Sequence, residues 1–451
     1  MASTILTRTV ASTGNNKILT WSGWVKRSDN STGQLIAANG NPSDANYIIF
    51  FEFTGGGLRF IIKSLNIIAN VETNTLFQDL SAWYHLVFTM DTTQATASDR
   101  VKMYVNGEQI TDFALATYPS QNLGTQFNNA ASVISVGGKY VSGANTDFFN
   151  GSMSHVHFID GTAYAPTAFG ETDTTTGQWK IKTSPSVTYG TNGFFILKDG
   201  NSVTDQSGNS NNLTVAGGTL TKTEDNPSNV FATLNPLATS SLMALSNGNL
   251  TATNSSASNS ANSFSTFVPT KGKYYVEYKV TATGGTSPML GIKQEYPDGF
   301  RLTNGNEGAA GYSTAYEASI RTDGQRYQNN GTASWGGTSF TTGDIISIAL
   351  DCDNGAGYIA KNGTYMYSGN PTSGASKTGA FVVWTQAQVN NFGQSFAVNN
   401  FNGGAVQANF GNGFFGTTAV ASAGTNASGN GIFEYDTPTG YTALSTKGLN
   451  S

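Results

Sequence analysis

The sequence predicts an all-β chain built as two tandem antiparallel jelly-roll β-sandwich domains, and three observations support this fold class. No long stretch has apolar residues at the three- and four-residue spacing of an amphipathic helix, and no capping box opens one. Short apolar or alternating runs recur throughout, separated by clusters of Gly, Asn, Asp and Ser, as in sandwiches and barrels. With 27 Phe and 19 Tyr, the chain has enough apolar surface to fold, although only 11% of its residues are charged.

The apolar runs place strands in both halves of the chain. They predict strands over 18–25, 47–53, 58–62, 83–90, 101–105, 133–136, 154–159 and 193–198, and then over 274–280, 289–292, 345–350, 357–360 and 381–384. One short helical turn is expected at Ala165–Phe169, because Pro166 suits a first helical position. Residues 238–262 are rich in Ser, Asn, Ala and Thr, which is typical of a linker. We therefore expect a first domain with its extension at 1–237, a linker at 238–262 and a second domain at 263–451.

Composition narrows the classes of partner. The net charge is −5 and there is no basic stripe, which argues against nucleic acid. No stretch approaches the ~18 apolar residues of a membrane span, so we expect no membrane insertion. The N-terminal residues 1–12 have no apolar segment of signal-peptide length, so we expect synthesis in a cytoplasm and exit, if any, by a route such as lysis. Cys352 is the one cysteine, so no intrachain disulfide can form.

Four short motifs in the first half follow one another in a recognisable order. They are Trp83-Tyr84-His85, the hairpin Tyr104-Val105-Asn106-Gly107, the strand end Gly137-Gly138 and the closing strand that follows Phe149-Asn150-Gly151. In this order, residues 1–165 resemble the laminin-G-like, concanavalin-A-like lectin family. The resemblance implies a β-sandwich that binds sugar, binds protein or has a purely structural role. Some members hold calcium in a loop, but no calcium ligand set matches here, so we expect no cofactor.

A second series of motifs runs through residues 263–446. It comprises Gly272–Tyr278, Gly343–Asp351, the hairpin Lys361-Asn362-Gly363, Asn409-Phe410-Gly411 and Pro438–Leu444. This series resembles the SPRY (B30.2-type) domain, with Thr385–Val406 expected to be an enlarged loop. The resemblance implies a binding module whose specificity lies in loops at one end of the sandwich.

The combination of the two domains with the segment Asn226–Pro236 resembles virion proteins of marine tailed bacteriophages. This resemblance implies a virion protein, made in the host cytoplasm and released by lysis, and oligomeric on the virion. Its partners would be other virion proteins and host cell-surface glycan. Two roles stay open: a tail-fibre or appendage module that recognises host glycan, and a capsid decoration or head-fibre protein that contacts other virion subunits.

The reactive side chains do not form a pattern that predicts catalysis. His155 and His157 alternate on a strand, as zinc ligands can, but flanking Val156 and Phe158 indicate ordinary packing. Acids alternate in two places, at 171 and 173 and at 434 and 436. Neither pair has a third acid two residues further along, so we expect no glycosidase. Cys352 lies between two aspartates, which disfavour a reactive thiolate. We therefore expect no catalytic residue and no metal site.

Aromatic residues beside polar, Gly-containing loops of the second domain are the candidates for ligand binding. An aromatic ring can stack on the apolar face of a sugar while amides and carboxylates bind its hydroxyl groups. The predicted site residues are Tyr296, Asp298, Tyr327, Asn329, Asn330 and Trp335. The alternative is that each aromatic packs over the edge of the sandwich. In that case, the next candidates for the binding surface are the first domain's loops at Asn39–Asn46 and Ser142–Phe148.

Overall fold

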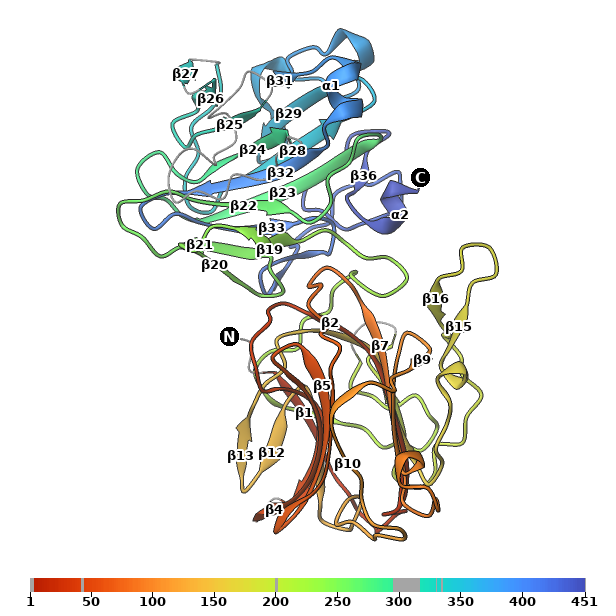
Figure 1. The fold of residues 1–451 in the computed structure, drawn as a ribbon. Coiled ribbons are helices and arrows are strands. Elements are labelled where there is room, and N and C mark those ends of the chain that lie inside the picture. Colours follow the sequence, from red (N-terminus) through yellow and green to blue (C-terminus); the bar gives the residue numbers. More distant parts are fainter. Residues whose placement is uncertain are drawn as a thin grey trace. The chain divides into compact units, whose positions relative to one another are not determined.

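The alternating runs form hydrogen-bonded antiparallel strands in a computed structural model of the chain (Figure 1). The structure describes residues 4–41, 44–198, 202–294, 317–329, 331–333 and 336–450. Over these ranges the chain is nearly all β, which confirms the predicted fold class. It divides into two units, Met1–Lys222 and Thr223–Ser451, and each is a β-sandwich with its own core.

The first unit stacks an eight-stranded sheet on a six-stranded sheet within the described residues. The eight-stranded sheet has the order β10 (Phe113–Thr117), β6 (Asn66–Thr73), β5 (Gly57–Ser64), β4 (Asp44–Thr54), β3 (Gln34–Asn41), β11 (Val133–Val136), β1 (Ile5–Thr9), β18 (Thr214–Gly217). The six-stranded sheet has the order β17 (Phe194–Ile196), β14 (Gly151–Asp160), β2 (Ile18–Arg27), β7 (Tyr84–Asp91), β8 (Val101–Val105), β9 (Glu108–Gln109). Short elements complete the unit: β12 (Lys139–Val141), β13 (Ala144–Thr146), β15 (Gly170–Thr172), β16 (Trp179–Ile181), and the 3₁₀ turns η1 (Ala97–Asp99) and η2 (Pro166–Ala168). The turn η2 confirms the helical turn predicted at Ala165–Phe169.

Aromatic side chains from both sheets fill the core of the first unit. The Phe51 ring stacks on Phe88 at 4.3 Å and on Phe60 at 5.4 Å between centroids, and Trp21 packs against the same group. All four side chains are at most 4% exposed. Burying a side chain of this size contributes roughly 1.5–3 kcal/mol, so this cluster holds the two sheets together.

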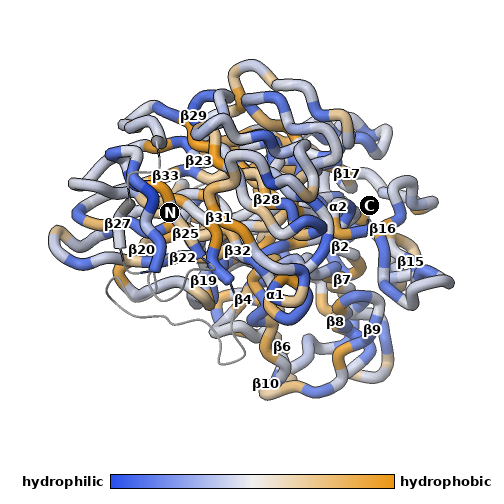
Figure 2. Tube along the Cα trace, turned by 90° about the horizontal axis from the view of Figure 1, so that it is seen from above, coloured by the Kyte–Doolittle hydropathy of each residue, from blue (hydrophilic) through white to orange (hydrophobic). Residues whose placement is uncertain are grey.

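The second unit also packs two sheets face to face. In the described residues, the seven-stranded sheet has the order β19 (Leu234–Thr239), β22 (Ala261–Ser265), β32 (Gln394–Asn400), β24 (Met289–Gln294), β25 (Ala318–Ile320), β26 (Arg326–Gln328), β27 (Gly331–Ala333). The other sheet has the order β20 (Met243–Ser246), β21 (Thr251–Asn254), β33 (Ala405–Asn409), β23 (Lys273–Ala282), β28 (Ile345–Asp351), β29 (Ala356–Lys361), β30 (Thr364–Tyr365), with β31 (Val382–Val383) on β29 and β36 (Thr442–Ala443) on β23. The remaining elements are β34 (Phe414–Phe415), β35 (Thr418–Ala419), α1 (Gln386–Asn391), α2 (Thr446–Leu449), η4 (Met366–Ser368) and η5 (Gly374–Ser376). Figure 2 shows a hydrophobic stretch at β31, while loops between strands are mostly polar.

The predicted linker at 238–262 is wrong, because β20, β21 and β22 lie there and pair with the sheets of the second unit. The chain divides at Lys222, before the expected boundary at 237. The Ser- and Asn-rich composition was misleading because several of these small polar side chains are buried within the sheets. Asn254, for example, is 2% exposed and its amide donates to the Asn400 carbonyl at 2.6 Å.

The predicted enlarged loop at Thr385–Val406 is also wrong. It contains α1, which opens with a capping box between Thr385 and Gln388, and the strand β32. In β32 only Phe396 and Val398 are large apolar residues, and both are fully buried. Their polar neighbours are buried as well, so the strand gives little apolar signal in the sequence.

The observed boundary predicts how fragments of the second unit will fold. A fragment 223–451 should unfold cooperatively, whereas 238–451 should be destabilised by several kcal/mol, because it lacks the buried Phe231 and Leu234. Urea denaturation followed by circular dichroism measures both midpoints. Equal midpoints would contradict the boundary at Lys222.

Candidate ligand-binding surface

Two of the six predicted site residues lie in one hairpin at the edge of the seven-stranded sheet. Tyr327 is half-buried in β26, opposite Ser319 on one side and Thr332 on the other. Asn329 forms the exposed turn between β26 and β27, with a φ of 53° that Asn tolerates better than most residues. The other four, Tyr296, Asp298, Asn330 and Trp335, lie outside the described residues. The structure thus brings Tyr327 and Asn329 together on one edge.

An aromatic residue that the sequence did not single out lies next to this hairpin. Tyr367, in η4, is 50% exposed and has a φ of 59°, and Ser368 follows with a φ of 53°. Two consecutive left-handed residues cost roughly 1–2 kcal/mol each, so the surrounding structure must hold this turn. Such strain in an exposed aromatic turn is typical of sites shaped for contact rather than for stability.

The neighbours of Tyr367 are Gly336, in a loop, and Arg326, in β26 of the seven-stranded sheet. A Cβ added to Gly336 would lie 2.9 Å from the Tyr367 ring, so only glycine lets this turn approach the aromatic face. Arg326, in β26, donates from Nη1 to the Phe381 carbonyl at 3.0 Å. Burial lowers the pKa of Arg326, and the nearby Tyr367 opposes that effect; the guanidinium still stays charged at neutral pH. We call Arg326, Gly336 and Tyr367 the Tyr367 surface.

The Tyr367 surface combines the groups that bind a polar ring. Tyr367 offers an exposed ring face, Arg326 a fixed cation and Asn329 an amide on the same hairpin as Arg326. A signal for Tyr367 was present in the sequence. It follows the Asn362-Gly363 hairpin and precedes Ser368-Gly369, which makes it an aromatic enclosed by turn residues.

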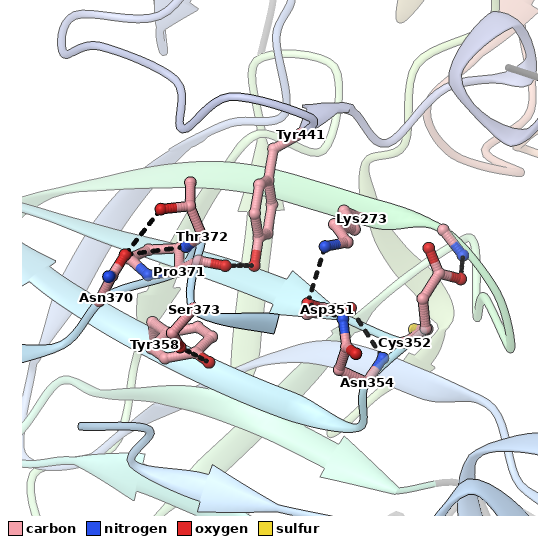
Figure 3. A network of polar contacts seen from close by, with 12 residues as sticks. Lys273, Asp351, Cys352, Asn354, Tyr358, Asn370, Pro371, Thr372, Ser373 and Tyr441 are labelled. Carbon is pink, nitrogen blue, oxygen red and sulfur yellow. Dashed lines mark hydrogen bonds and ion pairs between the residues drawn. The ribbon is translucent and has the colours of Figure 1, made fainter. Parts of the chain in front are cut away.

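A polar network of the second unit joins its loops to the sheet (Figure 3). Asp351 is fully buried, accepts from the Asn354 backbone and side-chain amides at 2.9 and 2.8 Å, and pairs with the Lys273 ammonium at 3.1 Å. Tyr441 donates its hydroxyl to the Pro371 carbonyl at 3.0 Å. These contacts attach the segments around 371 and 441 to the nine-stranded sheet.

Glu277 is the carboxyl whose pKa most resembles that of a general base. Burial raises the pKa of Glu277 to about 7, against the opposing hydrogen bonds from the backbone N–H groups of Glu434 and Tyr435 at 2.8 and 2.9 Å. Glu277 is 0% exposed, so a substrate cannot reach its carboxyl group. Glu277 therefore holds the C-terminal segment in place.

The histidines of the first unit are structural. His85 is 1% exposed, stacks on Trp24 at 4.9 Å, and accepts a hydrogen bond at Nδ1 from Trp179 Nε1 at 2.9 Å. Since the indole N–H only donates, the proton of neutral His85 is on Nε2, which bonds Ser22 Oγ at 2.9 Å. His157 Nδ1 bonds the Tyr189 hydroxyl at 2.9 Å.

One acid of each alternating pair accepts hydrogen bonds that fix it in place, and Glu171 pairs with Lys180. Asp173 accepts from the backbone N–H groups of Thr175 and Thr176, and these bonds lower its pKa to about 2. Asp436 accepts from the backbone and hydroxyl of Thr425, which also lowers its pKa. An ionised, turn-capping carboxylate cannot donate the proton that glycoside hydrolysis needs.

The described residues also bear on metal binding, membrane crossing and internal cavities. No three or more His, Cys, Asp or Glu side chains gather in a way that could hold a metal ion. No helix there is long and apolar enough to cross a membrane. In the first unit, a cavity between the β5–β6 hairpin and residues 123–127 holds about 20 Å³, enough for one water and too small for a sugar ring.

Comparison with known proteins gives a family match for the first unit. Residues 3–168 match the model of the concanavalin A-like lectin/glucanases superfamily. No curated protein sequence matches the chain. Similar solved structures include the SPRY domain of human HERC1, at 18% identity over 39% of this chain and 96% of that one, with a TM-score of 0.29. They also include the native heptameric SAP-like pentraxin from Limulus polyphemus (15% identity, 36% and 72% covered, TM-score 0.28) and the Ruminococcus gnavus IT-sialidase CBM40 bound to α2,3 sialyllactose (15%, 34% and 89%, TM-score 0.25).

The structure itself defines the class of fold, an all-β chain of two β-sandwich units. Residues 3–168 are similar to the concanavalin A-like lectin/glucanases superfamily, and SPRY domains are among the solved structures to which the chain is similar.

The two units should respond to acid in opposite directions. Burial lowers the pKa of His85 to about 3 and that of His157 well below 6.5, so below pH 6.5 the unfolded chain binds protons that the folded first unit does not. His85 should therefore cost the first unit about 2 kcal/mol of unfolding free energy at pH 5, and His157 acts in the same direction. The raised pKa of Glu277 has the opposite sign, because between pH 4.5 and 7 the folded second unit keeps a proton that the unfolded chain releases. The second unit should thus be more stable at pH 5 than at pH 8.

Hydrogen exchange of peptides from β7 and β23, measured at both pH values in denaturant, separates the two responses. His85→Gln should reduce the acid sensitivity of the first unit alone, and Glu277→Gln should remove the pH dependence of the second. Parallel responses of the two units would contradict the assignment.

Proposed function

We propose that the protein is a non-catalytic binding protein that recognises glycan, and that the Tyr367 surface is its contact with sugar. The observation on which this rests is the half-exposed Tyr367 ring, held in a strained turn beside Arg326. The lectin-like fold supports binding to glycan in general. No cofactor is needed for such binding.

The remaining predicted residues belong to the same proposal. Tyr327 and Asn329 lie on the hairpin that contains Arg326, and Trp335 precedes Gly336 in the sequence. Tyr296, Asp298 and Asn330 complete the proposed set. Stacking of one aromatic ring on a sugar is worth about 1–2 kcal/mol, judged from aromatic pairs, which is roughly tenfold in affinity.

We further propose a place for the protein on the virion of a tailed bacteriophage, as a tail-fibre or appendage module that attaches to host surface glycan. The support is the resemblance of the domain combination to such virion proteins. The alternative is a capsid decoration or head-fibre protein that contacts other virion subunits. Because the sequence has no coiled-coil heptads, the chain would either dock through sandwich surfaces or lie at the tip of a structure that another chain builds. Labelling intact virions with an antibody against this chain, and locating it on tail or capsid by electron microscopy, separates the two roles.

Tyr367→Ala should weaken binding to a glycan array, or to host cells, about tenfold, because the stacking face is lost. The melting temperature should hardly change, since the side chain is half exposed. The matched control is Leu237→Ala, which removes a 64% exposed side chain from β19. β19 is one edge of the seven-stranded sheet, and the hairpin with Arg326 is at the other edge. Unchanged binding by Tyr367→Ala, or an equal loss in the control, would refute the proposed surface.

The purified protein should release no reducing ends from a panel of polysaccharides. Asp173 and Asp436 are engaged in hydrogen bonds that lower their pKa, and Glu277 is enclosed, so none of these three acids is placed to act as a general acid. Turnover that is lost in Glu434→Gln or Glu171→Gln would show that the protein is an enzyme.

A further inference from the structure

The hairpin formed by β15 and β16 is a two-stranded sheet of its own and joins neither large sheet of the first unit (Figure 1). Within residues 170–181, Gly170 alone is buried, and most of the others are exposed. A two-stranded hairpin is marginally stable at best in water by itself. The order of this hairpin must therefore come from its contact with the sandwich.

Trp179 makes that contact. Its indole Nε1–H donates to His85 Nδ1 at 2.9 Å, and the two rings stack with their centroids 5.9 Å apart. Gly107 and Gly170 leave room for the indole, because a Cβ added to them would lie 2.6 and 2.5 Å from its ring. In the part of the chain that the structure describes, no other hydrogen bond joins residues 170–181 to a strand of the large sheets.

The segments on both sides of the hairpin are fastened to the sandwich independently of it. Phe169 is 1% exposed and packs with Val87 and Ile159. On the other side, the Tyr189 carbonyl accepts from the Asp160 N–H at 2.9 Å. The hairpin can therefore leave the sandwich while the rest of the first unit stays folded.

A proton on His85 would break the contact with Trp179. The bond needs an unprotonated Nδ1, because the indole N–H only donates, and a protonated Nδ1 would place two donors face to face. The other ring nitrogen, Nε2, bonds Ser22 Oγ at 2.9 Å. The ring of His85 thus has no carboxylate partner among the described residues that would stabilise a charge in the closed form.

The ionisable groups on the surrounding elements do not change this conclusion. His157 interacts with His85 as a second cation would, since His85 helps to lower the pKa of His157. In the hairpin, Lys180 pairs with Glu171 and Asp173. The ionisable residues of the elements around His85 are Lys26 in β2, Lys102 and Tyr104 in β8, Glu108 in β9, His155, His157 and Asp160 in β14, and Glu171, Asp173 and Lys180 in the hairpin.

We propose that the β15–β16 hairpin is a cover over His85 that opens in acid, while both large sheets of the first unit stay paired. Burial lowers the pKa of the covered His85 to about 3, and opening returns it toward the ordinary value of 6.5, so protons favour the open form between these values. The ratio of open to closed hairpin should therefore rise up to about 25-fold from pH 7 to pH 5. His85 itself keeps its place, because its ring also stacks on Trp24 at 4.9 Å.

Hydrogen exchange of the full chain, corrected for the intrinsic exchange rate at each pH, tests this opening. The amides of residues 171–181 should lose protection up to about 25-fold between pH 7 and pH 5. Their protection should hardly change in low concentrations of urea, since opening a short hairpin exposes little surface. The amides of β7 should be much better protected and should lose protection as urea rises, because they exchange through global unfolding.

His85→Gln should remove the pH dependence of the hairpin, because glutamine can still accept the indole hydrogen bond and does not titrate. His157→Gln is the matched control, since His157 is also 1% exposed but bonds Tyr189, outside the hairpin, so the pH dependence should remain. If His85→Gln fails to fold, the indole Nε1–H resonance of Trp179 in the unmodified chain gives a second measurement. After the same correction, it should exchange faster with water at pH 5 than at pH 7.

Three results would overturn the proposal. They are equal protection of the hairpin at both pH values, equal loss of its pH dependence in the two variants, and exchange of the hairpin only when the amides of β7 also exchange.

Discussion

Each sandwich depends on a buried carboxylate that gathers the segments closing it. In the first unit, Asp160 accepts from the Asn15 N–H at 2.7 Å, the Asn128 amide at 2.8 Å and the Asn192 N–H at 3.0 Å. Three connections that are distant in sequence therefore meet at one side chain. In the second unit, Glu277 does the same for residues 434–435, and Asn409 joins it from β33 at 3.4 Å.

This constraint follows from the composition of the chain. A protein with almost no helix must satisfy the backbone N–H groups of many long connections, and leaving one buried N–H unpaired costs about 1–3 kcal/mol. Hydrogen bonds to a charged acceptor contribute about 1.5–3 kcal/mol each, so one carboxylate can fix several connections. Asp205 repeats the device by accepting from the N–H groups of Phe195, Ser207 and Asn211. The few charges of this sequence are thus concentrated where they order the backbone.

Fixed connections also explain how exposed groups can be positioned without a deep pocket. The turn that presents Tyr367 is itself strained, and it can persist only if the neighbouring segments are rigid. The network around Asp351 and Tyr441 holds the segments next to that turn on the sheet. A shallow surface with a fixed aromatic ring is a sufficient site for a polysaccharide, which offers many weak contacts along its length.

Much of the fold could be predicted from the sequence, because strand alternation and Asn-Gly turns are local signals. The strand and hairpin around Tyr104–Gly107 appear where the sequence places them. The boundary near Lys222 could not be predicted, since the strands that follow it bury Ser and Asn rather than large apolar residues. For the site, the hairpin with Tyr327 and Asn329 was identified, but Tyr367 was missed. Its exposure depends on a left-handed backbone turn, and composition does not encode that turn for a tyrosine.

The claim that buried carboxylates hold the closing segments is tested most directly by native-state hydrogen exchange of the amides that they accept. Asn15, Asn192, Glu434 and Tyr435 all lie outside regular strands, so exchange as fast as in open loops is the default expectation for them. We predict that these four amides exchange as slowly as those of the central strands, and that Asp160→Asn accelerates the first two while Glu277→Gln accelerates the last two. Fast exchange at these positions in the unmodified protein would contradict the account.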